Sequence, residues 1–169
     1  MGPCGLKMQP FDSDSLGSAA ISYVDDRATL DYLLRAARRL RSESDCGFVL
    51  LNDEGTPVHF CWVKDFEGFR MAELDRTLQA PCANAVMIFD CFTPAAVRGR
   101  GFFGRAIAAL AEQLDSEGKA PWIFGAATNQ ASLRGIEKSG FAHKFTLGRK
   151  KIFFLQKAKD SIPFSDPAI

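Results

Sequence analysis

The sequence is poor in the residues that structural metal sites and disulfide frameworks need. Its 169 residues include two histidines and five cysteines, and no two cysteines form a Cys-x-x-Cys pair. An odd number of cysteines, two of them inside apolar runs, is typical of free buried thiols in a reducing compartment. Isolated histidines and cysteines do not make a ligand set, so we expect no metal ion.

An excess of one charge and long apolar runs are also lacking. The 21 basic and 20 acidic residues leave a formal net charge of +1, which gives no reason to expect nucleic acid or an anionic membrane as a partner. No apolar run approaches the roughly 18 residues of a membrane span. Residues 1–4 have neither the basic start nor the apolar region of a signal peptide. We therefore expect a cytoplasmic protein without a membrane partner.

What the sequence does contain is the composition of one globular domain, with 47% apolar residues and enough length for a proper core. Residues 1–20, rich in Gly, Ser, Pro and Asp, predict a loose N-terminal arm, with a short strand at 20–24. We expect the folded domain to span residues 21–157. Residues 158–169 carry two prolines and predict a mobile C-terminal tail.

The hydrophobic period indicates how helices and strands alternate along the chain. Apolar residues recur at helical spacing from Thr29 to Leu40, and the arginines between them are typical of a solvated helix face. Consecutive apolar residues bounded by turn signals favour strands elsewhere. The expected elements are helices over 29–40, 103–118 and 129–140, hairpins over 47–63 and 143–155, a third strand over 69–74, and strands over 86–92 and 121–127.

The stretch from Val97 to Arg105 joins a strand pattern to a helix pattern through glycines. The first backbone N–H groups of a helix have no intrahelical partner, and the helix dipole adds partial positive charge there. Glycines let backbone amides approach a phosphate closely, and Arg98, Arg100 and Arg105 add donors suited to phosphate oxygens. The junction therefore predicts an anion site.

Three kinds of phosphate loop compete for this stretch. A P-loop requires Gly-x-x-x-x-Gly-Lys-Ser/Thr, which does not occur here. Gly99, Gly101 and Gly104 match the dinucleotide fingerprint Gly-x-Gly-x-x-Gly literally, but no βαβ unit begins there. The run Arg98-Gly99-Arg100-Gly101, after an apolar strand and before a helix, resembles the pyrophosphate loop of the GNAT acyltransferase superfamily, Gln/Arg-x-x-Gly-x-Gly/Ala. Phe103, at the last position, departs from that pattern.

A second stretch downstream supports the resemblance. In its start, register and ending, the run from Asn129 to Phe141 resembles the superfamily motif Asn-x-x-Ala-x-x-x-Tyr-x-x-x-Gly-Phe. Ile136 stands where many members carry the Tyr that protonates the departing thiolate. The resemblance covers residues 47–155 and implies a single-domain, GNAT-like α/β fold with a mixed, mostly antiparallel sheet flanked by helices.

The resemblance also implies acetyl-CoA, or another acyl-CoA, as cosubstrate. Backbone groups at the end of the strand before the loop would hold the pantetheine arm, and one amide would polarise the thioester carbonyl. The implied cofactor-binding residues are Phe92, Thr93, Arg98, Gly99, Arg100, Gly101, Phe102, Phe103, Gly104 and Asn129.

An amine acceptor must lose a proton before it attacks, and we rank Glu73, Asp90 and His59 in that order as the base. Glu73 is expected on a strand among apolar neighbours, where desolvation would raise the pKa of its carboxyl, or else on an exposed edge. Three roles are open for Asp90: it could bind the ammonium of the substrate, act as the base, or have a structural role. His59 fits either a base or a hydrogen-bonded, half-buried imidazole. Cys91 has no histidine paired with it in sequence, which favours a small core residue over a nucleophile.

The function implied is transfer of an acetyl group from acetyl-CoA to a primary amine by direct attack. A catalytically silent acyl-CoA-binding or sensing domain stays open, because the Tyr is missing. Transfer of a longer acyl or aminoacyl group also stays open, because Phe102 and Phe103 add aromatic bulk at the loop. The expected partner is a small-molecule amine, with no nucleic acid and no membrane, and a homodimer is left open.

Overall fold

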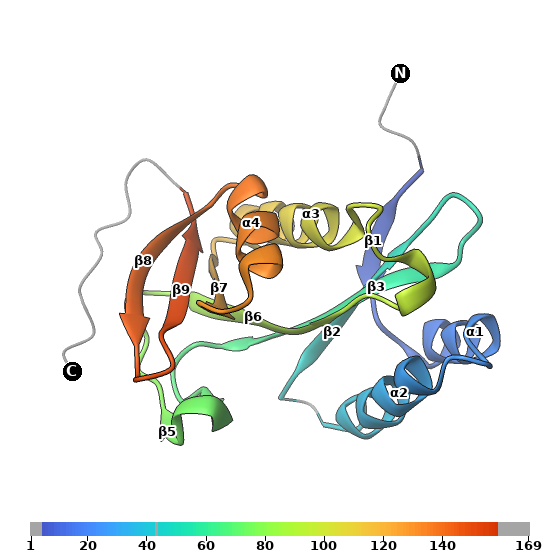
Figure 1. Cartoon of the computed structure of the whole chain (residues 1–169), viewed down its shortest axis with the longest axis horizontal. Helices are drawn as coiled ribbons and strands as arrows, with labels where there is room; N and C mark the ends of the chain where they lie inside the picture. The colour runs from blue at the N-terminus through green and yellow to red at the C-terminus, as the bar shows by residue number, and fades with distance from the viewer. Residues whose placement is uncertain (1–4, 43, 159–169) are drawn as a thin grey trace. The chain divides into compact units, whose positions relative to one another are not determined.

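The computed structural model of the chain describes residues 5–42 and 44–158 (Figure 1). Its helices and strands are joined by short loops and, among the described residues, two single turns of 3₁₀ helix. In chain order the elements are β1 (Lys7–Pro10), α1 (Ser13–Ser22), α2 (Arg27–Arg39), β2 (Cys46–Leu51), β3 (Pro57–Asp65), β4 (Arg70–Met71), η1 (Ala72–Leu74), β5 (Arg76–Thr77), β6 (Ala85–Phe92), η2 (Ala95–Val97), α3 (Phe102–Ser116), β7 (Ala120–Ala126), α4 (Gln130–Lys138), β8 (Phe141–Leu147) and β9 (Ile152–Lys157).

Seven strands form one mixed sheet in the order β1-β2-β3-β6-β7-β9-β8, and β4 and β5 form a separate two-stranded pair. The β1–β2, β2–β3, β7–β9 and β8–β9 neighbours are antiparallel, whereas β6 and β7 are parallel. With the α helices of the described chain, this arrangement confirms the predicted single-domain α/β class with a mixed, mostly antiparallel sheet. Both predicted hairpins are confirmed as β2–β3 and β8–β9.

The described residues group into two compact units. The first draws on residues 5–63 and 90–106, and the second on residues 64–89 and 107–158. The elements β3, β6 and α3 each contribute residues to both units. The predicted phosphate loop and the strand end before it belong to the first unit, and the Asn129 motif belongs to the second.

In the first unit, α1 and α2 lie side by side (Figure 1). The core beside the hairpin is aromatic: the Phe11 ring lies 5.1 Å from the Phe60 ring and 5.9 Å from the Trp62 ring. Gly47 is required at this point, because a Cβ there would lie 3.0 Å from both Phe11 Cβ and the Trp62 ring. A strand residue without a side chain thus makes room for the aromatic core.

In the second unit, α4 packs against β7 and β8. The core is again aromatic, with the rings of Phe145 and Phe154 stacked at 4.7 Å and Trp122 at 5.7 Å from Phe145. Gly125 of β7 faces α4, since a Cβ there would come within 2.9 Å of Leu133 Cδ2. The close approach of helix and strand depends on that glycine.

Two predictions about local structure are wrong. The loose arm expected over residues 1–20 does not hold for residues 7–10, which form β1, or for residues 13–20, which belong to α1. Instead of the strand expected at 20–24, the chain has the end of α1 and a turn. Asp12 starts α1 with a capping box: its carboxylate accepts the Ser15 N–H at 2.8 Å while the Ser15 hydroxyl accepts the Asp12 N–H at 3.0 Å. That box satisfies two helix-terminal donors, and it outweighs the scattered Gly and Ser residues.

The third strand expected over 69–74 is also wrong. Only Arg70 and Met71 are extended there, and the chain then turns through η1 and Asp75, whose φ is 49°. The expected domain limits at 21 and 157 remain predictions. Apart from Ala158, the expected C-terminal tail lies outside the described residues.

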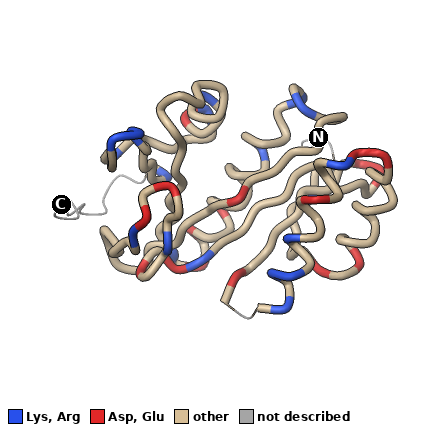
Figure 2. Tube along the Cα trace, turned by 60° about the horizontal axis from the view of Figure 1, so that its bottom comes forward, with Lys and Arg blue, Asp and Glu red and all other residues tan. Residues whose placement is uncertain are grey.

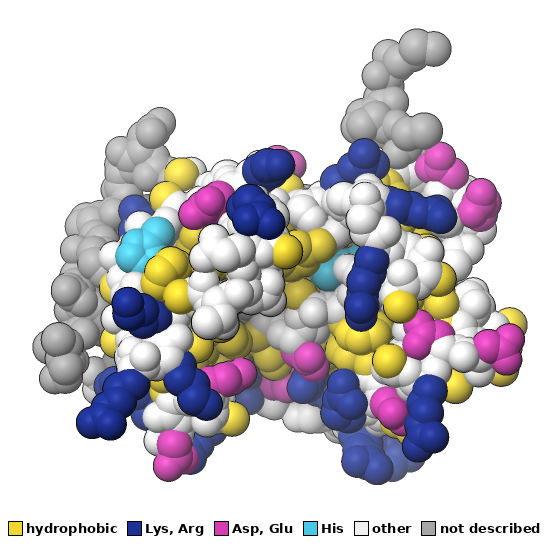
Figure 3. Space-filling view, viewed as in Figure 1, with side chains coloured by type: hydrophobic (Ala, Val, Ile, Leu, Met, Phe, Trp, Pro, Cys, Tyr) yellow, Lys and Arg dark blue, Asp and Glu magenta, His cyan; other side chains and the backbone are white. Residues whose placement is uncertain are grey.

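Charges of both signs are interspersed along the trace in Figure 2 and on the face shown in Figure 3. This matches the formal net charge of +1. Within the described residues, no helix is both long and apolar enough to cross a bilayer.

Candidate functional site

The predicted phosphate loop has the backbone conformation that a close approach by a ligand needs. Gly99 and Gly101 both have φ of 77°, a left-handed conformation that only glycine adopts without strain. A Cβ built at either position would meet no heavy atom within 4 Å. The space outside both glycines is therefore open, and only hydrogen atoms separate their backbone from it.

The helix that follows presents its first amides beside these glycines. Helix α3 starts at Phe102, and its first intrahelical bond runs from Arg105 N to Gly101 O at 3.2 Å. The N–H groups of Phe102 and Phe103 precede that bond, so they have no acceptor within the helix. Together with the dipole of a helix that extends to Ser116, they form a site suited to an anion.

Arg98 connects this loop to the end of β6. Its Nε donates to the Thr93 carbonyl at 2.9 Å, and its guanidinium lies 5.9 Å from the centre of the Phe92 ring. The remaining guanidinium donors can face a phosphate. Arg98 and Arg100 are both exposed, so both side chains are accessible to a ligand.

His59 is brought to the same strand end. Its Nδ1 shares a hydrogen bond of 2.7 Å with Thr93 Oγ1, and its ring lies 5.6 Å from the Phe103 ring. The side chain is buried at 1% exposure, and burial lowers the pKa of His59 to about 3. The imidazole is thus neutral at physiological pH. Of the two alternatives that the sequence left open, it matches the hydrogen-bonded imidazole, but it is fully buried and not half-buried. A ring this costly to protonate is a poor base.

The second buried nitrogen of His59 is unusual. Among the described residues, Nε2 has no hydrogen-bond partner although the atom is shielded from solvent. The bond to Thr93 leaves Nε2 as either a donor or an acceptor, depending on the tautomer.

Asp90 is held rather than free. Its carboxylate Oδ2 lies 2.5 Å from Arg39 Nη1, and its carbonyl accepts the Tyr32 hydroxyl at 3.1 Å. Of the roles that the sequence left open for Asp90, this geometry supports the structural one. The sequence analysis did not predict the role of Arg39, because it assigned the arginines of this helix to a solvated face. The available signal was the spacing: Tyr32 and Arg39 are seven residues apart, which places both on one face of the helix.

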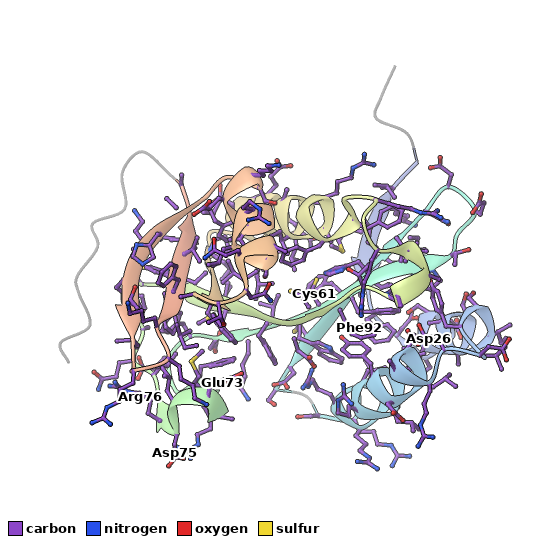
Figure 4. The ribbon with its side chains drawn as sticks, in the orientation of Figure 1. Asp26, Cys61, Glu73, Asp75, Arg76 and Phe92 are labelled. Carbon is purple, nitrogen blue, oxygen red and sulfur yellow. The ribbon has the colours of Figure 1, made fainter. Side chains whose placement is uncertain are left out.

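Glu73 does not occupy the position that made it the leading base. It lies in the exposed 3₁₀ turn η1 and not on a strand. Figure 4 labels it with Asp75 and Arg76 on the same small segment. The expected strand position among apolar neighbours is therefore wrong, and the exposed carboxylate keeps its hydration.

The Asn129 motif folds as its local chemistry dictates. Asn129 caps α4, with Oδ1 accepting the Ser132 N–H at 3.1 Å, and Gly140 has a φ of 86°, the left-handed position predicted after the helix. Ile136 is fully buried at 0% exposure. A contact between Asn129 and a cofactor stays a prediction.

Cys61 is a buried core thiol, whereas Cys91 is only partly buried. Burial raises the pKa of both, that of Cys61 to about 12. A thiol that stays protonated is a weak nucleophile, which disfavours the interpretation of Cys91 as an acyl-carrying nucleophile. In the part of the chain that the structure describes, no cluster of three or more His, Cys, Asp or Glu side chains could hold a metal ion.

No protein-family model matches this sequence, and no curated protein matches it. Solved structures do match its fold at low sequence identity. The ribosomal-protein-S5-alanine acetyltransferase of Vibrio fischeri superposes with a TM-score of 0.61 at 12% identity, over 92% of this chain and 93% of that one. A spermidine N-acetyltransferase mutant from Vibrio cholerae gives a TM-score of 0.59 at 10% identity, over 89% and 92%.

A third structure was solved with a ligand. YncA of Salmonella typhimurium, assigned as an acetyltransferase and solved with its cofactor acetyl-CoA, gives a TM-score of 0.58 at 16% identity, over 97% of this chain and 98% of that one. At such identities the likeness concerns the fold. This chain has the fold of the GNAT acetyltransferases, as the loop at Gly101 and the motif at Asn129 predicted.

Proposed function

We propose that this protein is an acyl-CoA-dependent N-acyltransferase that moves an acetyl group from acetyl-CoA to a primary amine. The observation that carries the proposal is the loop from Arg98 to Phe103. Its two left-handed glycines, open space and helix N-terminus form an anion site directly after the strand end. The fold shared with N-acetyltransferases makes the pyrophosphate of CoA the fitting anion.

The loop fits a diphosphate by both charge and access. The N–H groups of Phe102 and Phe103 can each donate to a phosphate oxygen, and the exposed Arg98 and Arg100 supply positive charge. The Phe103 side chain, which departs from the family pattern, turns to the His59 ring at 5.6 Å. The aromatic residue at that position therefore leaves the glycine surfaces open, since no atom lies within 4 Å of a Cβ there.

The reaction needs positioning more than side-chain acids. A neutral amine attacks the thioester carbon, a C–N bond forms, the C–S bond breaks and the CoA thiolate leaves. The backbone at Phe92 and Thr93 supplies the N–H that stabilises the oxyanion. With Glu73 solvated, Asp90 paired to Arg39 and His59 buried, we assign the amine proton to solvent. A CoA thiolate is a tolerable leaving group near neutral pH, so Ile136 in place of Tyr does not prevent transfer.

The proposal also covers the acceptor amine, the oligomeric assembly and the location in the cell. A spermidine N-acetyltransferase shares this fold, which supports a primary amine as acceptor. One spermidine N-acetyltransferase of this fold is dodecameric, and an assembly of this chain stays a prediction, as does its place in the cytoplasm.

A catalytically silent acyl-CoA-binding domain is the second candidate, and a specific observation favours it. Ile136, at the place of the family's Tyr, is fully buried, so no phenol can protonate the thiolate from that position. Transfer of a longer acyl or aminoacyl group remains the third candidate function.

Titration calorimetry with CoA and acetyl-CoA, followed by a thiol-release assay against a panel of amines, tests the proposal. We expect binding of both ligands and release of CoA that requires an amine. Binding without turnover on any amine would select the silent domain. Absence of binding would overturn the acyl-CoA assignment, and a panel of acyl chain lengths decides the third candidate.

A further inference from the structure

We propose that Arg39 and Tyr32 of α2 are positioning residues that hold the end of β6 in the conformation that acyl transfer requires. The proposal rests on the proposed function, because it concerns the strand end that would receive the thioester. Arg39, Tyr32, Trp62 and Asp90 are here called the α2 clasp. All four belong to the first compact unit.

The strand end is a strained piece of backbone. Asp90 lies inside β6, yet its φ is 47°. A residue with a side chain rarely adopts this left-handed conformation inside a strand, although Asp and Asn tolerate it better than most. Such a conformation persists only where the surrounding structure holds it, and it is most frequent at functional sites. Phe92 and Thr93, two and three residues further on, take their direction from this bend.

The clasp holds the Asp90 side chain through Arg39. Arg39 Nη1 lies 2.5 Å from Asp90 Oδ2, and Arg39 Nε lies 3.5 Å from a carboxylate oxygen of Asp45. The guanidinium also stacks on the Trp62 ring at 4.8 Å. The ion pairs and the ring contact together fix the orientation of Arg39, and a lysine would reproduce them only in part because it lacks the planar guanidinium.

The clasp holds the Asp90 backbone through Tyr32. The Tyr32 hydroxyl donates to the Asp90 carbonyl at 3.1 Å and accepts the Trp62 Nε1–H at 3.1 Å. Burial raises the pKa of Tyr32, so the phenol remains a donor at physiological pH. The same ring stacks on Phe92 at 4.4 Å with an interplanar angle of 10°. Figure 4 labels Phe92 at this end of β6.

One face of α2 thus holds Asp90 through both its side chain and its backbone carbonyl, and it holds Phe92 through ring stacking. Thr93 is restrained in turn by Arg98 and His59. Because a displacement of about 1 Å can cost about 10²-fold in rate, loosening this backbone should lower the rate of transfer and leave phosphate recognition at the loop intact.

The test compares Arg39→Met, Arg39→Lys and Tyr32→Phe with Arg38→Met, an exposed arginine of the same helix. We expect kcat to fall about 10- to 100-fold in Arg39→Met and Tyr32→Phe, with the Kd for CoA within about twofold of wild type. Arg39→Lys should restore part of the rate, and Arg38→Met should match wild type. Asp90→Asn, which tolerates the bend but loses the charge, should add little to Arg39→Met, because both remove the same ion pair.

Amide hydrogen exchange over residues 90–94 gives a second readout that does not depend on turnover. Exchange there should be faster in Arg39→Met and Tyr32→Phe than in wild type and Arg38→Met. Unchanged exchange, or an unchanged kcat with faster exchange, would overturn the clasp. A parallel loss of kcat and CoA affinity would also overturn it, since that is the pattern of general destabilisation. A wild-type protein without turnover would instead count against the proposed function.

Discussion

Replacing Gly101 by alanine tests the phosphate loop against a matched site on the same helix. Gly101 has a φ of 77°, and an added Cβ would meet no heavy atom within 4 Å. The cost to the unliganded protein is therefore conformational, about 1–2 kcal/mol for a left-handed residue with a side chain. Gly118, which follows α3, has a φ of 76° and is equally open, so Gly118→Ala should lose a similar amount.

The two variants should differ once CoA is added. A phosphate oxygen that accepts a backbone N–H comes to about 2.9 Å from the nitrogen. Under the proposed function, the methyl group of Gly101→Ala would occupy the side from which the phosphate approaches. Losing one hydrogen bond to a charged group costs about 1.5–3 kcal/mol, which weakens Kd about 10- to 150-fold. At Gly118 no such bond is expected, so the Kd for CoA should be unchanged.

Calorimetry with CoA gives the two dissociation constants, and thermal unfolding without ligand gives the two stabilities. Equal stability losses with a weakened Kd only in Gly101→Ala would support the loop as the pyrophosphate site. Equal Kd values in the two variants would refute it, because a pyrophosphate bound at this loop must approach the glycine backbone.

Acetyl-CoA at about 100 dissociation constants should stabilise the protein by about 2.7 kcal/mol, seen as a higher melting temperature, and an equal shift with NAD would contradict specific recognition. Glu73→Gln should keep turnover within a few fold in the thiol-release assay, because the carboxylate is solvated; a loss of about 10²-fold would make it the base after all. Burial holds the pKa of His59 at about 3, against 6.5 for a free imidazole, so the unfolded chain takes the proton first as the pH falls. The contribution of neutral His59 to the free energy of unfolding is therefore fully present above pH 6.5 and is lost toward pH 3, with about 2–3 kcal/mol lost at pH 4.5. Urea titrations should show this loss in wild type and in His143→Gln, the control at an exposed histidine. They should not show it in His59→Gln.

How far the sequence predicts this fold depends on how local each signal is. The loop was predictable because Gly99, Gly101 and the arginines are neighbours in sequence, and the change of hydrophobic period falls on them. Helix α1 was predictable too, from Asp12 and Ser15 spaced as a capping box. Gly and Ser composition outweighed that spacing in the prediction of a loose arm.

The misplacement of Glu73 has a different cause. A short apolar run such as residues 69–74 does not distinguish a strand from a turn that buries alternate residues. Phe69 and Met71 are buried while Glu73 is exposed, so the alternation was real. It belonged to a two-residue strand followed by a 3₁₀ turn.

The bond partners of Asp90 were beyond local reasoning for another reason. Arg39 and Asp90 are 51 residues apart, and Tyr32 and Asp90 are 58 apart. Nothing in either segment identifies the other, because a helix arginine is usually solvated and a strand-end aspartate usually caps a turn. Only the fold brings them together, and that is how a predicted base becomes part of a positioning network.

The missing Tyr has a structural counterpart that bears on catalysis. A Cβ at Gly125 would lie 2.9 Å from Leu133 and 3.6 Å from Ile136, so α4 approaches β7 as closely as a glycine permits. Ile136 fills that contact and is fully buried. A tyrosine at 136 would overpack this interface or move the helix, at a cost of about 1–3 kcal/mol. Ile136 is thus part of the packing of the second unit, and under the proposed function the thiolate would leave without a phenol from this position. Under the proposed function, the rate then depends on how well the backbone around Thr93 is held, which is the property that the α2 clasp and Arg98 control.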